Sequence, residues 1–171
     1  MNLPTDLLEQ ARMLHGLETR RPKQASLRRA VSTAYYSLFH LFVDEATTMM
    51  FGGQLNRRKY RHVLGRGYSH TSMNSACRSF AGAMLPNSIA AVLGSFSIPP
   101  ELQTVSSTFV QLQQKRHHAD YNLARQFSKS EVALLLTDTQ DAFDLWQGIR
   151  NDDTSRFFLM ALPLWEQLKR S

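Results

Sequence analysis

Apolar residues along the chain recur mainly at steps of three and four, the spacing that places side chains on one face of an α-helix. In the clearest example, one stripe along residues 101–123 consists of Leu102, Val105, Phe109, Leu112, Arg116, Ala119 and Leu123. Every member of this stripe except Arg116 is apolar or small. A guanidinium stays charged and is costly to bury alone, so Arg116 should face a carboxylate, a phosphate or water. Asp120 follows one helical turn later and can supply that carboxylate.

The same spacing predicts helices along most of the chain, and alternating β-branched runs are absent. Helices are predicted over residues 4–17, 22–50, 69–84, 89–93, 101–124, 130–149 and 155–169, with a basic loop or short irregular helix over 54–67. Ser128 and Glu131 form a capping box before one of these helices. The sequence therefore predicts an all-α protein, an antiparallel four- to five-helix bundle with an extra C-terminal helix. We expect residues 1–150 to form the bundle, and 151–171 to pack on it or on a second subunit.

The long helix predicted over residues 22–50 has two occupied faces. Its apolar face comprises Leu27, Val31, Ala34, Leu38, Leu41, Phe42 and Met49. A second, polar and aromatic face comprises Arg29, Thr33, Tyr36 and His40, again at steps of four and three. This second face is suited to meeting another helix, a subunit or a ligand.

The composition narrows the class of protein. The chain has 171 residues, of which 43% are apolar, which suits one globular domain. The single cysteine, Cys77, excludes an internal disulfide framework and suits a reducing compartment. We find no secretory signal at the start, and the apolar run 157–165 is too short to cross a bilayer. A cytoplasmic protein without contact with a membrane is expected. His62 and His70 have no partner at metal-ligand spacing, so neither a metal nor a cofactor is predicted.

Positive charge is concentrated in the middle of the chain. The net charge is +6, and residues 46–100 contain six basic residues and no acidic one. Five of these six form a candidate nucleic-acid patch: Arg57, Arg58, Lys59, Arg61 and Arg66. Such asymmetry favours an anionic partner, with nucleic acid first and an acidic protein second. The alternative is a basic loop that faces only water.

Two segments together resemble the HEPN superfamily, small helical domains often found beside nucleotidyltransferases. The first is residues 27–40, LRRAVSTAYYSLFH, which is similar to the family's early helix. The second is residues 116–121, RHHADY, which resembles the Arg-x-x-Ala-Asp-Tyr form of the family's late helix. The resemblance covers roughly residues 3–149. It implies an antiparallel bundle of four or five helices and a homodimer.

Many HEPN proteins are metal-independent ribonucleases or toxins, so the resemblance also implies a possible active site. Their signature is an Arg followed, after four to six residues, by a His. The Arg holds the scissile phosphate and the His moves the proton of the 2′-hydroxyl. In this chain the positions expected for the His hold Tyr121, Asn122 and Leu123. The catalytic His of the family is therefore absent after Arg116.

These observations lead to three functional hypotheses. In the first, a HEPN-like domain binds RNA, a nucleotide or a nucleotidyltransferase-type partner, as in toxin–antitoxin-type two-component systems. The second is a metal-independent endoribonuclease with another base, and the third is a structural protein-interaction module. The candidate catalytic residues are Arg116, Asp120 and His40. The candidate ligand-binding residues are Arg29, Tyr36, His118 and Tyr121. Two alternatives remain open: His118 in place of His40 as the base, and a purely structural ion pair between Arg116 and Asp120.

Overall fold

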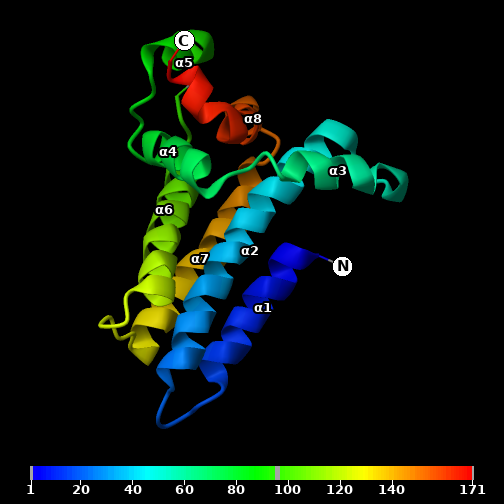
Figure 1. Cartoon of the computed structure of the whole chain (residues 1–171). Helices are drawn as coiled ribbons and strands as arrows, with labels where there is room; N and C mark the ends of the chain where they lie inside the picture. Colours follow the sequence, from blue (N-terminus) through cyan, green and yellow to red (C-terminus); the bar gives the residue numbers. More distant parts are fainter. Residues whose placement is uncertain (1, 95–96, 171) are drawn as a thin grey trace. The chain divides into compact units, whose positions relative to one another are not determined.

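The computed structural model describes residues 2–94 and 97–170, and their regular secondary structure is entirely helical (Figure 1). The elements are α1 (Leu3–Gly16), α2 (Gln24–Phe51), the 3-10 helix η1 (Leu55–Arg57), α3 (Arg58–Gly65), α4 (His70–Ala81), α5 (Asn87–Leu93), α6 (Pro100–Tyr121), α7 (Lys129–Ile149) and α8 (Asp153–Leu168). The all-α class is confirmed. The antiparallel bundle of four to five helices stays a prediction.

The chain forms two compact units, and each is discontinuous in the sequence. Unit 1 comprises the residues up to 40 together with 108–144. Unit 2 comprises residues 41–107 together with those from 145 onwards. Helices α2, α6 and α7 each contribute one part to each unit.

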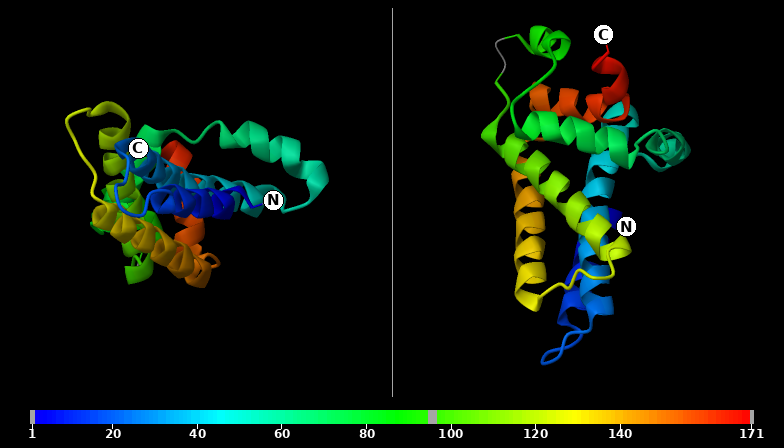
Figure 2. Two further views of the ribbon diagram at one scale, coloured as in Figure 1. Left: turned by 90° about the horizontal axis from the view of Figure 1, so that it is seen from below. Right: turned by 60° about the vertical axis from the view of Figure 1, so that its left-hand side comes forward.

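Unit 1 is built around the first part of α2, and α1 lies alongside it (Figures 1 and 2). Residues 30–35 and 37–39 of α2 are all buried, and a helix that is buried nearly all round lies inside a core. Tyr35 packs against Phe109 of α6, with ring centroids 5.4 Å apart. The predicted inward residues Leu8 and Ala11 of α1 are buried as well. The core of this unit therefore follows the predicted apolar faces.

Helix α6 ends at Tyr121, earlier than the sequence pattern predicts. The side-chain oxygen of Asn122 accepts hydrogen bonds from the backbone amides of Ala124 and Arg125, at 3.1 and 3.2 Å. This local turn competes with further helix. The expectation that Leu123 belongs to the buried stripe is consequently wrong, since Leu123 is 88% exposed.

The end of α6 is also capped by an arginine from α2. The guanidinium of Arg28 donates to the carbonyls of Ala119 and Asn122, both at 2.8 Å, and also to the carbonyl of Arg125. The last carbonyls of a helix lack partners within it, and a cation beside them is favourable. Arg28 therefore fixes α2 against the end of α6.

Helix α7 begins with half of the predicted capping box. The hydroxyl of Ser128 accepts from the backbone amide of Glu131 at 3.0 Å, as the motif requires. The Glu131 carboxylate does not complete the box and accepts instead from Lys115 at 2.6 Å and Arg125 at 2.5 Å. Partial burial raises the pKa of Glu131, but the two cations outweigh it and hold this pKa below its usual value.

Unit 2 has a core rich in aromatic residues, to which α4 and α8 contribute. These two helices pack against each other, as the right-hand view in Figure 2 shows. Phe158 of α8 lies at the centre, with ring centroids 4.9 Å from Phe80 and 5.3 Å from Phe42. The predicted inward face of α4 is confirmed, because its members are fully buried: Met73, Ala76, Cys77 and Phe80.

A proline inside α8 leaves one backbone carbonyl without its helical donor. Pro163 has no amide hydrogen, so the carbonyl of Leu159, four residues earlier, lacks its usual partner. The buried hydroxyl of Tyr68 donates to this carbonyl at 3.4 Å. Ser72 of α4 donates to the neighbouring carbonyl of Leu162 at 2.7 Å. Side chains outside α8 thus donate to two of its carbonyls, one of which has no helical donor because of Pro163.

Candidate functional sites

Arg116 lies near the end of α6 in unit 1, where it forms an ion pair with Asp120 on the same helix. Its Nε lies 2.7 Å from Oδ2 of Asp120, although the N–H is not aligned as a hydrogen bond. Its Nη2 donates to the hydroxyl of Tyr36 on α2 at 3.1 Å. The side chains of Arg116 and Asp120 are 18% and 27% exposed. The guanidinium is therefore largely enclosed and already has partners within the protein.

Three tyrosine rings surround the same guanidinium. Its carbon lies 5.9, 5.5 and 5.8 Å from the ring centroids of Tyr35, Tyr36 and Tyr121, within the range of cation–π attraction. Burial lowers the pKa of Arg116, but the oxygens of Tyr36 and Asp120 outweigh it and raise this pKa above its usual value. Arg116 is consequently a permanent cation in an aromatic setting.

Asp120 also connects α6 to α2. The hydroxyl of Ser32 donates to Oδ1 of Asp120 at 2.5 Å, while Oδ2 faces Arg116. The two charges of this pair offset each other, and a phosphate attracted by Arg116 would be repelled by Asp120 at short range. As it stands, the centre is better built to hold two helices in register than to attract an anion.

The other predicted residues of unit 1 lie around this centre to different degrees. His40 neighbours Tyr36, with ring centroids 6.4 Å apart. His118 is half-buried, and Tyr121 is largely exposed. Arg29 lies on the exposed surface of α2. The structure thus places Tyr36 and Tyr121 in contact with Arg116, and His40 beside Tyr36.

Two contributors to this centre were missed by the sequence reasoning. Ser32 lies one turn before Tyr36 on α2 and Arg28 lies two turns before it, and both contact α6. A stripe at steps of four, Arg28, Ser32 and Tyr36, was present in the sequence as a signal. The predicted polar face shares Tyr36 with this stripe, but it contains Arg29 and Thr33, each one position after the residue that contacts α6.

The predicted basic patch in unit 2 forms a short helical segment, which we call the basic arm (residues 55–66). It consists of η1, α3 and Arg66, and no residue of η1 or α3 is buried. Two of its cations have partners: Arg57 donates to the carbonyl of Phe51 at 2.9 Å, and Arg61 lies 3.4 Å from the carboxylate of Asp44. The other cations of the arm are exposed and make no ion pair within the described part of the chain: Arg58, Lys59 and Arg66.

The basic arm is held in place against the last turns of α2. Gly52 ends α2 with a φ of +71°, a left-handed conformation that glycine adopts without strain. Arg61 donates to the hydroxyl of Thr48 at 3.0 Å. At Gly65 a Cβ atom would lie 3.2 Å from Cγ1 of Val43, so the arm approaches α2 closely there. The exposed cations are therefore presented on a defined surface.

A cavity of about 400 Å³ lies between α6 and α7 within unit 1. Leu112 and Leu135 form part of its wall, and the Lys115–Glu131 ion pair borders it. None of the predicted site residues lines this cavity. Its charged lining residues are one base and two acids, Lys115, Glu131 and Asp138, so the cavity does not favour an anion.

Within residues 2–94 and 97–170 the side chains of His, Cys, Asp and Glu form no group of three that could hold a metal ion. None of the helices described here is both long and apolar enough to span a bilayer. Comparisons with protein-family models, with curated proteins and with solved structures gave no match to this chain.

Proposed function

We propose that the protein is a HEPN-like helical domain that binds RNA, and that the basic arm makes the main contact with the phosphate backbone. The observation that carries the proposal is the exposed positive charge of the arm. Arg57, Arg58, Lys59 and Arg66 have no carboxylate partner among the described residues, and residues 46–100 contain no acid. Cations of this kind release counterions when they meet phosphates, which favours binding.

An extended polyanion fits this surface better than a single nucleotide does. Arg58 and Arg66 are eight positions apart, about 12 Å along a helix at 1.5 Å per residue. Nucleotide sites are usually concave, whereas every residue from 52 to 60 is exposed. The charge is thus spread along a surface, as a backbone with many phosphates requires.

The arm is also a stronger candidate for phosphate contact than Arg116. Asp120 offsets the charge of Arg116, and Tyr36 occupies one of its donors. Of the arm cations, only Arg61 has a carboxylate partner in the described residues, and that distance is 3.4 Å. The homodimer, the nucleotidyltransferase-type partner and the toxin–antitoxin role remain part of the proposal through the family resemblance alone.

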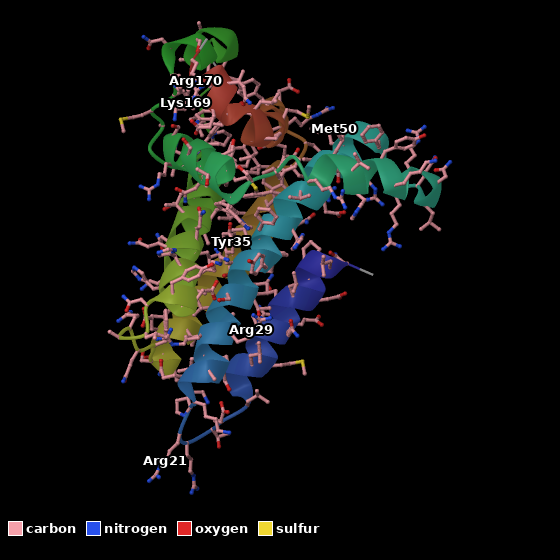
Figure 3. All side chains as sticks on the ribbon, viewed as in Figure 1. Arg21, Arg29, Tyr35, Met50, Lys169 and Arg170 are labelled. Atoms are coloured by element: carbon pink, nitrogen blue, oxygen red, sulfur yellow. The ribbon has the colours of Figure 1, made fainter. Side chains whose placement is uncertain are left out.

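The test compares two matched pairs of adjacent arginine or lysine residues. Arg58→Ala with Lys59→Ala removes two cations of the arm. Arg20→Ala with Arg21→Ala removes two exposed cations from the loop between α1 and α2, where Arg21 extends away from the helices (Figure 3). Affinity for a fluorescent RNA is measured over a range of salt concentrations. The arm pair should weaken binding and lower the salt slope by about 1.4, two contacts at about 0.7 each.

The control pair should change the RNA affinity and its salt slope much less than the arm pair does. Equal effects of the two pairs would show that binding depends on net charge and not on the arm. If the unaltered protein bound no RNA at low salt, the proposed function would be wrong.

A second candidate function is metal-independent RNA cleavage, and the position of Tyr36 is the observation that favours it. Tyr36 contacts Arg116 and neighbours His40. A phosphate bound by Arg116 and the general base His40 would therefore share one surface of unit 1. Labelled RNA is incubated with the protein in EDTA. Cleavage that disappears in Arg116→Ala and in His40→Ala, with helical content unchanged by circular dichroism, supports this function. An absence of cleavage above background removes it.

A further inference from the structure

The basic arm carries exposed apolar side chains between its cations. Leu55 is 84% exposed, Val63 64% and Tyr60 50%. An arm that contacted only phosphates would not need an aromatic ring on its surface. Aromatic rings beside cations are the usual means by which proteins bind unpaired bases, because every base has a face that can stack.

Tyr60 is the residue of the arm with the geometry for such stacking. Its ring lies nearly parallel to that of Phe51, with centroids 5.7 Å apart and an angle of 21° between the planes. Phe51 is the last residue of α2, and its ring packs against the tyrosine ring. The Nζ of Lys59 lies over the Tyr60 ring, 5.3 Å from its centroid, so this flexible side chain swings aside when a base stacks there. An aromatic surface and a phosphate-binding cation are therefore adjacent.

The turn between α2 and the arm fixes the orientation of this ring pair. Gly52, with its positive φ, allows the chain to turn directly after Phe51. Arg57 then donates to the carbonyl of Phe51 at 2.9 Å, which ties the start of the arm to the end of α2. A ring that is held before the ligand arrives loses little conformational freedom on binding.

We infer that Tyr60 stacks on an unpaired base, so that the basic arm binds single-stranded RNA in preference to duplex RNA. This inference rests on the proposed function, because the cations of the arm are taken to hold the same RNA strand. In a duplex the bases are stacked inside the helix, and only phosphates and 2′-hydroxyls reach a protein surface of this kind. A duplex would therefore use Arg58 and Lys59 without Tyr60.

The experiment measures binding to a short oligouridine and to a perfect RNA duplex with the same number of phosphates. Tyr60→Ala removes the ring, Tyr60→Phe keeps it, and Val63→Ala shortens another exposed side chain of the same helix. For the oligouridine, Tyr60→Ala should weaken binding about 5- to 150-fold, the range found for loss of one stacked base. Its affinity for the duplex should change less than about twofold. Tyr60→Phe and Val63→Ala should resemble the unaltered protein with both RNAs.

Three results would overturn the inference: an equal loss with both RNAs, a Tyr60→Phe variant as weak as Tyr60→Ala, or an equal effect of Val63→Ala. The double variant with Arg58→Ala and Lys59→Ala shows whether only the stacking by Tyr60 fails or the proposed RNA binding fails as well. If that pair weakens binding to both RNAs while Tyr60→Ala shows no preference, RNA binding stands and stacking is rejected. Binding to vesicles of anionic phospholipid but to neither RNA would reject both.

Discussion

Arg116 shows how one charged residue can occupy an apolar stripe without a large cost. Its guanidinium has Asp120 one turn along the same helix, a tyrosine hydroxyl from α2, and three aromatic rings around it. An isolated buried cation would be expensive, whereas a cation with these partners keeps its charge and orients both helices. The structure therefore gives the pair an architectural role, and any contact with RNA would be added to it.

We predict that the single substitution Asp120→Ala lowers the free energy of unfolding. The substitution removes the partner of Arg116 and the acceptor of the Ser32 hydroxyl, and it leaves a largely enclosed guanidinium without its carboxylate. We expect a loss of about 1–3 kcal/mol in the free energy of unfolding, measured with urea. Asp141→Ala on the exposed side of α7 serves as the control, and its effect should lie within about 0.5 kcal/mol of zero. Similar losses for both variants would contradict the role assigned to Asp120.

The residues of this centre were predictable from the sequence only in part. The pairing of Arg116 with Asp120 follows from their spacing on one helix, and it was predicted. The contacts of Arg28 and Ser32 depend on how α2 is rotated toward α6, and their register differs from that of Arg29 by a single position. Spacing along one helix defines a stripe, but it does not show which of two neighbouring stripes faces the other helix.

Among the elements, α7 offers the clearest test of a local signal. Ser128 caps the amide of Glu131, whereas Ser130, exposed within the first turn, caps no amide and meets only the Ser128 hydroxyl at 3.1 Å. We predict that Ser128→Ala lowers the free energy of unfolding by about 1 kcal/mol, because one amide at the helix start loses its acceptor. Ser130→Ala should change it much less. Urea unfolding of the two variants checks the prediction, which fails if Ser130→Ala costs as much as Ser128→Ala.

Most helix boundaries were predictable, and the C-terminal ends of α4 and α6 were not. For α1, α2, α5, α7 and α8 the expected ends lie within two residues of those observed. The end of α6 was missed because Asn122 turns the chain while the apolar spacing continues to Leu123. The basic arm has no buried residue in η1 or α3, so no inward face marked it as a helix.

For the molecule as a whole, Tyr68 makes the free energy of unfolding depend on pH in the alkaline range. Burial raises the pKa of Tyr68 to about 12 from its usual value of 10.0. The folded state therefore holds this proton more tightly than the unfolded state does. The resulting contribution to stability is complete below pH 10 and is lost as the pH rises toward 12.

We predict that Tyr68→Phe makes the protein less stable by about 1 kcal/mol near neutral pH, because the Leu159 carbonyl loses its donor. The difference between the two proteins should shrink above pH 10, where ionisation of Tyr68 penalises the unaltered protein alone. Urea unfolding from pH 8 to pH 11 measures this difference. Tyr60→Phe, at a half-exposed position, is the control and should give a constant difference. If the difference in free energy of unfolding between Tyr68→Phe and the unaltered protein stayed constant to pH 11, the raised pKa assigned to Tyr68 would be contradicted.

The discontinuous composition of unit 1 has a consequence for the growing chain on the ribosome. Helix α1 and the first part of α2 need partners from residues 108–144, which are made about 100 residues later. At 5–20 residues per second this delay is roughly 5–20 s. Throughout it the apolar residues of α2, from Leu27 to Phe39, have not yet met their final neighbours. We therefore expect a chaperone that binds nascent apolar segments to engage this stretch first, and to leave it only after α7 has emerged.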